Sequence, residues 1–235
     1  ACLVGSEMCI RDRLNGGIQD AANLMWKIAL VETHRARPSI LESYDRERKP
    51  FSDKVQRDTA IAMRAATASN WLLERIRDGI LARLATLEPI QERLRSTVSE
   101  LGLHYRNSPI VCERGGTSQL RAGDRAPDCE VTDERGAPFR IFDLLKEPLH
   151  TAIVVKPPHN ADLERFARLF TTYRDIMHGM VLIDGDATFR ALYMQDDGAL
   201  YVIRPDGYIG FHGGADDLEA LEAWAGDLFL APAQR

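Results

Sequence analysis

Apolar residues recur every three or four positions in the first hundred residues of the chain, and they gather in short consecutive runs after residue 128. The first pattern is typical of amphipathic helices and predicts them over 17–34, 39–55, 60–68 and 71–87, with one more piece between Pro89 and Gly102. Asn15 is suited to cap the first helix and Pro38 to end it, whereas Pro50 is expected to kink or restart the second. The stripe expected to face the core from the first helix consists of Ile18, Ala21, Ala22, Met25, Ile28 and Ala29.

The second half of the chain has a different pattern. It predicts a short amphipathic element over 139–145, strands over 151–156, 180–183, 198–203 and 208–212, and helices over 161–177 and 216–230. The last two strands flank Arg204-Pro205-Asp206-Gly207, a sequence suited to a hairpin turn. Apolar periodicity is lost over 104–128, where proline and glycine are frequent, which predicts a linker. The order of these elements predicts an α/β fold, a helical segment followed by an α/β sandwich.

Composition and charge exclude several classes of protein. The 235 residues are 45% hydrophobic and 28% charged, as in ordinary globular proteins, and the net charge of −5 argues against a general nucleic-acid binder. The longest apolar runs fall far short of the roughly 20 residues that a membrane-spanning helix needs. Of the four cysteines, Cys2 and Cys9 lie within the first 13 residues, and Cys112 and Cys129 are widely separated. These cysteines and the six scattered histidines form neither a disulfide framework nor metal-ligand spacing. We therefore expect a cytoplasmic protein without a membrane span, a bound metal or a nucleic-acid partner.

The segment Leu14–Lys27, LNGGIQDAANLMWK, carries the most specific signal. Together with SYDRERKP at 43–50, it resembles the last flavin-contacting segment and a later helix of the class A FAD-dependent aromatic hydroxylases. The sequence departs from that family's pattern where Arg11-Asp12-Arg13 replaces a Gly-Gln-Gly turn and Gly16 replaces the usual Thr or Ser. Residues 1–13 resemble a translated sequencing-adapter tail, and we expect them to lie outside the fold. A genuine short N-terminus is the alternative, whereas Glu7 argues against a signal peptide.

The second half also carries a resemblance. APDCEV at 126–131 and YVIRPDGYIGF at 201–211, in the element order above, are similar to the thioredoxin-like C-terminal domain of phenol hydroxylase and of 3-(3-hydroxyphenyl)propionate and polyketide hydroxylases. The two resemblances imply the helical end of a FAD-binding domain over 14–103, a linker over 104–122 and a thioredoxin-like domain over 123–235. They imply further that the chain is the C-terminal portion of a larger enzyme.

The resemblance implies that the parent protein hydroxylates an aromatic small molecule with FAD, NAD(P)H and oxygen. A reduced flavin places negative charge at its N1/O2 edge, and a helix N-terminus stabilises such charge through its free amides and its dipole. The resemblance puts the backbone of Leu14 and Asn15 against this edge, with Gly16 and Gly17 permitting close approach. On these residues alone, a simple helix cap is the alternative. No catalytic side chain can be named, because the family draws its substrate-side acids and bases from upstream segments.

Other side chains are interpreted as structural. We expect Asp20 to serve the start of its helix, Trp26 to pack in the core, and Tyr44, Glu47 and Arg48 to hold their helix in place, with Glu47 or Arg48 as an anchor to the rest of the FAD domain. Four acidic residues should form the solvated face of the last helix, namely Asp216, Asp217, Glu219 and Glu222.

Two alternatives to the monooxygenase remain open. One is a noncatalytic thioredoxin-like module for dimerisation or interaction, in which the chain forms a homodimer. The other is a thiol redox protein, which needs a low-pKa cysteine after the first core strand. The turn at that place reads Lys156-Pro157-Pro158-His159-Asn160 and contains no sulfur, and Cys129 precedes the core without a resolving partner. The redox alternative is accordingly disfavoured.

Overall fold

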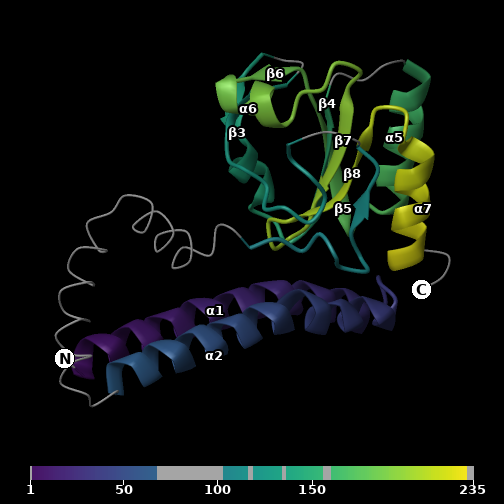
Figure 1. Ribbon diagram of the computed structural model, residues 1–235. Helices are drawn as coiled ribbons and strands as arrows, with labels where there is room; N and C mark the ends of the chain where they lie inside the picture. Colours follow the sequence, from purple (N-terminus) through teal and green to yellow (C-terminus); the bar gives the residue numbers. More distant parts are fainter. Residues whose placement is uncertain (1, 68–102, 116–118, 134–135, 156–159, 232–235) are drawn as a thin grey trace. The chain divides into compact units, whose positions relative to one another are not determined.

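Two helices begin the chain in the computed structural model, which describes residues 2–67, 103–115, 119–133, 136–155 and 160–231. Helix α1 spans Cys2–Glu32, the 3₁₀ helix η1 spans Pro38–Glu42 and helix α2 spans Ser43–Thr67 (Figure 1). The expectation that the first helix starts after an Asn15 cap is wrong, and residues 2–13, expected outside the fold, are helical. Residues 2–32 contain no proline, and each residue added to a nucleated helix gains a hydrogen bond, so the three glycines at 5, 16 and 17 do not stop it.

Helix α2 continues through Pro50. The expected restart of the helix at this proline is therefore wrong, since a proline removes one ladder hydrogen bond without removing those of its neighbours. The helices expected over 71–87 and between Pro89 and Gly102 lie outside the described residues.

The chain divides into two compact units. One comprises Ala1–Asp20 and Arg48–Leu103, and the other comprises Ala21–Glu47 and His104–Arg235. Within the described part of the first unit lie the N-terminal portion of α1 and α2 from Arg48 onward. The second unit contains the remainder of both helices together with the sheets, so the chain segment 21–47 belongs to the same compact body as the α/β half.

A five-stranded sheet organises the second unit, with the order β1-β8-β7-β4-β5. These strands are β1 Cys112–Glu113, β4 His150–Val155, β5 Met177–Leu182, β7 Ala199–Ile203 and β8 Ile209–Gly214. Strand β4 is parallel to β5 and antiparallel to β7, and β7 and β8 form the expected hairpin across the Arg204–Gly207 turn. Gly207 has φ of +82°, a conformation that favours glycine.

Three helices accompany the sheet: α5 Asn160–Thr172 follows β4, α6 Ala187–Leu192 follows β5, and α7 Leu218–Leu228 follows β8. The strand order β5-β4-β7-β8, with one parallel pair and one terminal hairpin, is that of the thioredoxin-like fold. The α/β fold class is thus confirmed. None of the helices in the described residues combines the length and the apolar character that a membrane crossing needs.

A second, three-stranded sheet of order β3-β2-β6 went unpredicted. Its strands are β2 Glu130–Thr132, β3 Pro138–Arg140 and β6 Asp184–Gly185, and the 3₁₀ helix η2 Ile141–Leu145 follows β3. Strands of two or three residues are too short for an alternating pattern to identify them.

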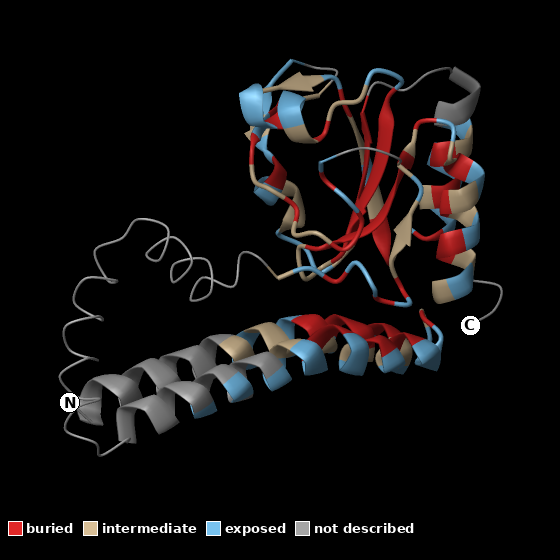
Figure 2. Ribbon diagram, viewed as in Figure 1, coloured by how far each residue is buried: buried red, intermediate tan, exposed pale blue. Residues whose placement is uncertain are grey.

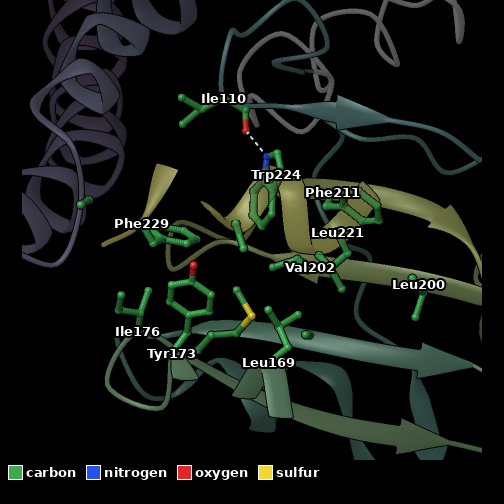
Figure 3. Packing of buried hydrophobic residues seen from close by; sticks show 14 of the residues in the cluster. Ile110, Leu169, Tyr173, Ile176, Leu200, Val202, Phe211, Leu221, Trp224 and Phe229 are labelled. Atoms are coloured by element: carbon green, nitrogen blue, oxygen red, sulfur yellow. Dashed lines mark hydrogen bonds between the residues drawn. The ribbon is translucent and has the colours of Figure 1, made fainter. Parts of the chain in front are cut away.

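The central sheet buries both of its faces. Along β4, Ala152 and Val154 join a core with α5 and α7, whereas Ile153 and Val155 join a second core with α6 and the small sheet. Figure 2 shows β4 and β7 buried along their length, as expected for strands covered on both sides. In the first core, the indole of Trp224 donates to the carbonyl oxygen of Ile110 at 3.0 Å (Figure 3).

The segment expected to be a linker is packed into the second unit. Tyr105, Ile110, Leu120 and Ala122 are buried, and β1 pairs in parallel with β8. Gly123 has φ of +90°, and an added Cβ would lie 2.3 Å from the backbone nitrogen of Arg106. The backbone at Gly123 therefore packs directly against the backbone at Arg106. The linker prediction was wrong because single apolar residues at irregular spacing hold this segment in the core. Such residues produce no helical or strand periodicity in the sequence.

The apolar stripe of α1 does not face the core as expected. Ile18 is 59% exposed and Met25 is 61% exposed, and three more members of the stripe, Ala21, Ala22 and Ala29, are also exposed. The helix instead buries Asn23, Trp26, Lys27 and Leu30. These residues also have helical spacing. Because Asn23 and Lys27 are polar, the sequence pattern does not identify this face as the buried one.

Candidate functional site

The segment expected to contact flavin lies inside α1. Because α1 spans Cys2–Glu32, the amides of Leu14 and Asn15 occupy interior helical positions, where amides are bonded to carbonyls one turn earlier. An added Cβ at Gly17 would meet nothing within 4 Å, and at Gly16 it would lie 3.8 Å from a ring carbon of Phe51. Space beside the backbone is therefore open at Gly17, whereas at Gly16 the ring of Phe51 already lies at contact distance. The assignment of Leu14, Asn15, Gly16 and Gly17 to flavin binding stays a prediction.

Arg48 binds the same stretch of α1. Its guanidinium donates to the carboxylate of Asp20 at 2.5 Å and to the carbonyl oxygen of Gly16 at 3.3 Å, and it lies 4.8 Å from the ring centroid of Phe51. The Arg48 side chain is 3% exposed and that of Asp20 is 42% exposed. Asp20 thus holds an arginine of α2, which is a structural role. The expected role at the start of its helix is wrong, because Asp20 lies in the interior of α1.

A group of polar side chains is buried in the second unit, and we call it the Glu47 cluster. Its members are Asn23, Trp26, Lys27, Glu47, Ser108, Arg204 and Asp206. Arg204 donates to both carboxylate oxygens of Glu47, at 2.6 and 3.0 Å. The ammonium of Lys27 donates to Glu47 at 2.8 Å, and so do the amide of Asn23 at 2.6 Å and the hydroxyl of Ser108 at 2.6 Å. The Glu47 carboxylate therefore accepts five hydrogen bonds.

Asp206 completes the cluster from the hairpin turn. It accepts from Arg204 through both of its oxygens, one at 3.0 Å, and from the indole of Trp26 at 3.2 Å. The Arg204 guanidinium also lies 5.3 Å from the ring centroids of Trp26 and Tyr105. A planar guanidinium stacks on aromatic faces while its edge binds carboxylates, so these contacts hold it in one orientation.

The charged side chains of the cluster balance one another. Two cations face two anions, and the side chains of Lys27, Glu47, Arg204 and Asp206 are at most 2% exposed. Burial opposes the charge on Glu47, but Arg204 and Lys27 outweigh it and lower the pKa of Glu47 to about 2. Burial, aided by Arg204, lowers the pKa of Lys27 to about 8 against the attraction of Glu47. The pKa of Arg204 is raised, because its two carboxylate partners overcome the effect of burial.

Three sequence fragments that carry the family resemblance meet in this cluster. Asn23, Trp26 and Lys27 come from the α1 segment, Glu47 from SYDRERKP, and Arg204 and Asp206 from YVIRPDGYIGF. Sequence reasoning correctly gave Trp26 a place in the core and Glu47 a holding role. It missed that the partner of Glu47 is the hairpin turn. The available signal was the pair Asn23 and Lys27, polar residues on the same helical face as Trp26.

A second buried polar group joins β1 to β8. The imidazole of His212 contacts a carboxylate oxygen of Glu113 at 2.8 Å and the amide nitrogen of Gln195 at 2.7 Å, and it stacks on Tyr201 with ring centroids 4.6 Å apart. Glu113 also accepts from the backbone of Gly115 and Ala122. Every ring nitrogen here has a partner within the fold, which favours a structural role.

The described cysteines are poorly suited to thiol exchange. Burial raises the pKa of Cys129 to about 12, with Asp186 and Asp128 adding to the effect, and burial also raises the pKa of Cys112. A redox-active cysteine needs the opposite shift. In the described residues, no three side chains of the His, Cys, Asp or Glu type come together as metal ligands.

Comparison with known proteins places this geometry in context. Residues 14–59 match the family described as FAD binding domain. The 6-methylpretetramide 4-monooxygenase of Streptomyces rimosus is 28% identical over 231 residues, which cover 93% of this chain and 42% of that protein. The pentachlorophenol 4-monooxygenase of Sphingobium chlorophenolicum is 29% identical over 163 residues, 69% of this chain and 28% of that protein. The expected likeness to aromatic hydroxylases is confirmed, and the chain spans less than half the length of these relatives.

The fold agrees with a solved structure as well. An aromatic hydroxylase from angucycline biosynthesis superimposes with a TM-score of 0.66 at 24% identity, over 91% of this chain and 41% of that one. At this identity the agreement concerns the fold alone.

Proposed function

We propose that this chain is part of a flavin-dependent monooxygenase that hydroxylates an aromatic, phenolic substrate with FAD, NAD(P)H and oxygen. The observation that carries the proposal is the match of residues 14–59 to the FAD binding domain family within a chain whose relatives include monooxygenases over 93% of its length. A noncatalytic thioredoxin-like module is not favoured, because the likeness to these enzymes runs through both the helical segment and the α/β half.

Leu14, Asn15, Gly16 and Gly17 are the residues that would hold the flavin. Bound flavin supplies the chemistry that transfers an oxygen atom to the ring, while the chain supplies backbone donors. Gly17 permits approach, since an added Cβ there would meet nothing within 4 Å. The amides of Leu14 and Asn15 become free donors only if α1 starts at this segment, as a helix N-terminus requires. The proposal therefore includes a start of α1 near Leu14 in the flavin-bound protein.

The thioredoxin-like domain would contribute support rather than chemistry. Its buried, high-pKa Cys129 is unsuited to exchange, and its hairpin turn supplies the charges of the Glu47 cluster. We propose a cytoplasmic enzyme, with a homodimer through this domain as a further proposal.

The test starts from the gene region upstream of Leu14. We expect it to encode a Gly-x-Gly-x-x-Gly turn between a strand and a helix, the feature that binds the ADP half of FAD. The extended protein should purify with a flavin absorbance spectrum and oxidise NAD(P)H faster when a phenolic substrate is added. The chain of 235 residues alone should bind FAD weakly, since it lacks that turn. An extended protein that takes up no FAD would refute the proposal.

A further inference from the structure

Helix α1 presents an apolar surface to water between Ala21 and Val31. The polar side chains of this stretch, Asn23 and Lys27, are buried, and every side chain that is exposed or half-buried is apolar. The exposed residues are Ala21, Ala22, Met25 and Ala29, and the half-buried ones are Leu24, Ile28 and Val31. The inner side of the stretch is bound within the second compact unit through the Glu47 cluster. A helix with a packed inner side and an apolar outer side is typical of a protein interior.

Two other helices of the same unit present charge to water. Helix α5 exposes Glu164 and Arg168, and α7 exposes Glu219 and Asp227. On α1 we call the four exposed apolar residues the Met25 face, namely Ala21, Ala22, Met25 and Ala29. The face extends about 12 Å along the helix. Its central Met25 is 61% exposed. Because the core of an interface is depleted of charge, an uncharged patch of this kind marks a place of contact.

The size of the Met25 face decides between two kinds of partner. Three of its four side chains are alanine, so it offers far less than the roughly 800 Å² per partner that a stable complex of separate chains buries. A part of the same polypeptide needs no such area, because its effective concentration is high. The face lies within residues 14–59, which match the FAD binding domain family, and the chain spans 42% of the related 6-methylpretetramide 4-monooxygenase. These observations favour a neighbour from the FAD-binding domain over a second copy of the chain.

We propose that the Met25 face is the docking surface for the dinucleotide-binding part of the same FAD-binding domain, which covers it with uncharged apolar side chains. The identity of this partner rests on the proposed function. The alanines let a neighbouring element approach the backbone of α1 closely, and the flexible side chain of Met25 fills the space that remains. One stretch of α1 thus joins two bodies, since its inner side binds the thioredoxin-like domain and its outer side binds the dinucleotide fold.

Oxidation by hydrogen peroxide tests the proposal without any substitution, because an accessible thioether reacts faster than a covered one. Peptide mass spectrometry measures the rate at each methionine. In the chain of 235 residues, Met25 should be oxidised quickly and Met177, which is 1% exposed, slowly. In the extended protein the rate at Met25 should fall about tenfold or more. The half-buried Met194 is the control and should keep the same rate in both proteins.

A charge placed on the Met25 face gives a second measurement. Met25→Glu should leave the thermal midpoint of the 235-residue chain unchanged, because the side chain is exposed there. In the extended protein the same substitution buries a carboxylate against apolar side chains and should lower the midpoint by about 5 °C or more. The matched control is Ser39→Glu, which adds the same charge at an exposed position outside the face and should change neither midpoint.

Equal oxidation rates at Met25 in the two proteins, or an equal effect of Met25→Glu on both midpoints, would overturn the inference. A second copy would be the occupant if Met25 of the 235-residue chain is protected at high concentration and Met25→Glu converts a dimer to a monomer in light scattering. That result would overturn the inference as well. If the extended protein takes up no FAD, the proposed function fails, and the oxidation rate at Met25 still decides whether the face is covered.

Discussion

The Glu47 cluster and the exposed arginine pairs of the same domain use the same chemistry in different surroundings. Arg204 meets Glu47 at 2.6 and 3.0 Å, while Arg106 meets Asp124 at 2.7 and 2.9 Å and Arg190 meets Asp184 at 2.8 and 2.8 Å. The geometries hardly differ, but the Arg204 side chain is 1% exposed and that of Arg190 is 59% exposed. Water stabilises each partner of the exposed pairs separately, whereas the buried partners have only each other. The contact distance therefore does not tell how much a charge matters, and its burial does.

The largest expected effect is that of removing Arg204. Arg204→Met leaves Glu47 and Asp206 buried with Lys27 as the one remaining cation of the cluster. Breaking a buried pair in this way should lower the free energy of unfolding by about 3 to 5 kcal/mol. Urea titration followed by tryptophan fluorescence measures it, since Trp26 lies against the cluster. A loss no greater than that of an exposed pair would show that burial is not the deciding difference.

Acid should reveal a buried group that has no charged partner. His150 packs between Trp26 and Phe229, with ring centroids 5.0 and 4.9 Å away, and its Nδ1 has no hydrogen-bond partner among the described residues. Burial, together with the charge of Arg204, lowers the pKa of His150 to about 3 from 6.5. The folded state then binds fewer protons than the unfolded state between these values, so stability is lost as the pH falls below 6.5.

The size of this loss can be separated from that of Glu47. The low pKa of Glu47 matters only below its ordinary value of 4.5, so the window from pH 6.5 to 4.5 is free of it. At about 1.4 kcal/mol for each pH unit, His150 should contribute a loss of roughly 2 to 3 kcal/mol there. Urea titrations at several pH values should give a flatter profile for His150→Phe than for the unaltered chain. Parallel profiles would contradict the assignment.

Removing one neutral donor from the cluster should have a smaller effect. Ser108→Ala takes one of five hydrogen bonds from the Glu47 carboxylate and leaves the ionic partners in place. We expect a loss of about 1 to 2 kcal/mol, which thermal unfolding by calorimetry can measure. Ser39→Ala is the control, because Ser39 is exposed and is not a member of the Glu47 cluster. A loss as large as that of Arg204→Met would mean that the hydroxyl, rather than the guanidinium, holds Glu47.

The smallest effect is expected for the exposed pair. Arg190→Met removes a two-point contact with Asp184 that water can replace on both sides. Its urea midpoint should agree with that of the unaltered chain within the scatter of repeated measurements. A clear shift of the midpoint would mean that a two-point arginine–carboxylate contact stabilises the fold even when it is exposed to water. Burial would then not explain the difference from Arg204.

The sequence predicted most where a single pattern decides the structure. The β7–β8 hairpin followed from two apolar runs around a Pro-Asp-Gly turn, and β4 from a run buried on both faces. The prediction failed where polar residues are buried and apolar residues are exposed. Lys27 and Asn23 lie on the buried face of α1, while Met25 faces solvent. The same reason hid the Glu47 cluster. The free-energy cost of burying each charge is offset by partners of opposite charge or by hydrogen-bond partners from distant segments. No local window of the sequence contains those partners.

The membership of residues 21–47 in the second compact unit has a consequence for dividing the protein into pieces. A fragment cut at the sequence-predicted boundary near residue 104 would carry Arg204 and Asp206 but neither Lys27 nor Glu47. It would also lose Trp26, Leu30 and Ile40 from its core, which would leave apolar surface open beside an Arg204 that has lost its partner Glu47. The autonomous folding unit of this chain is therefore discontinuous, and a soluble thioredoxin-like fragment has to retain the end of α1, η1 and the first turn of α2.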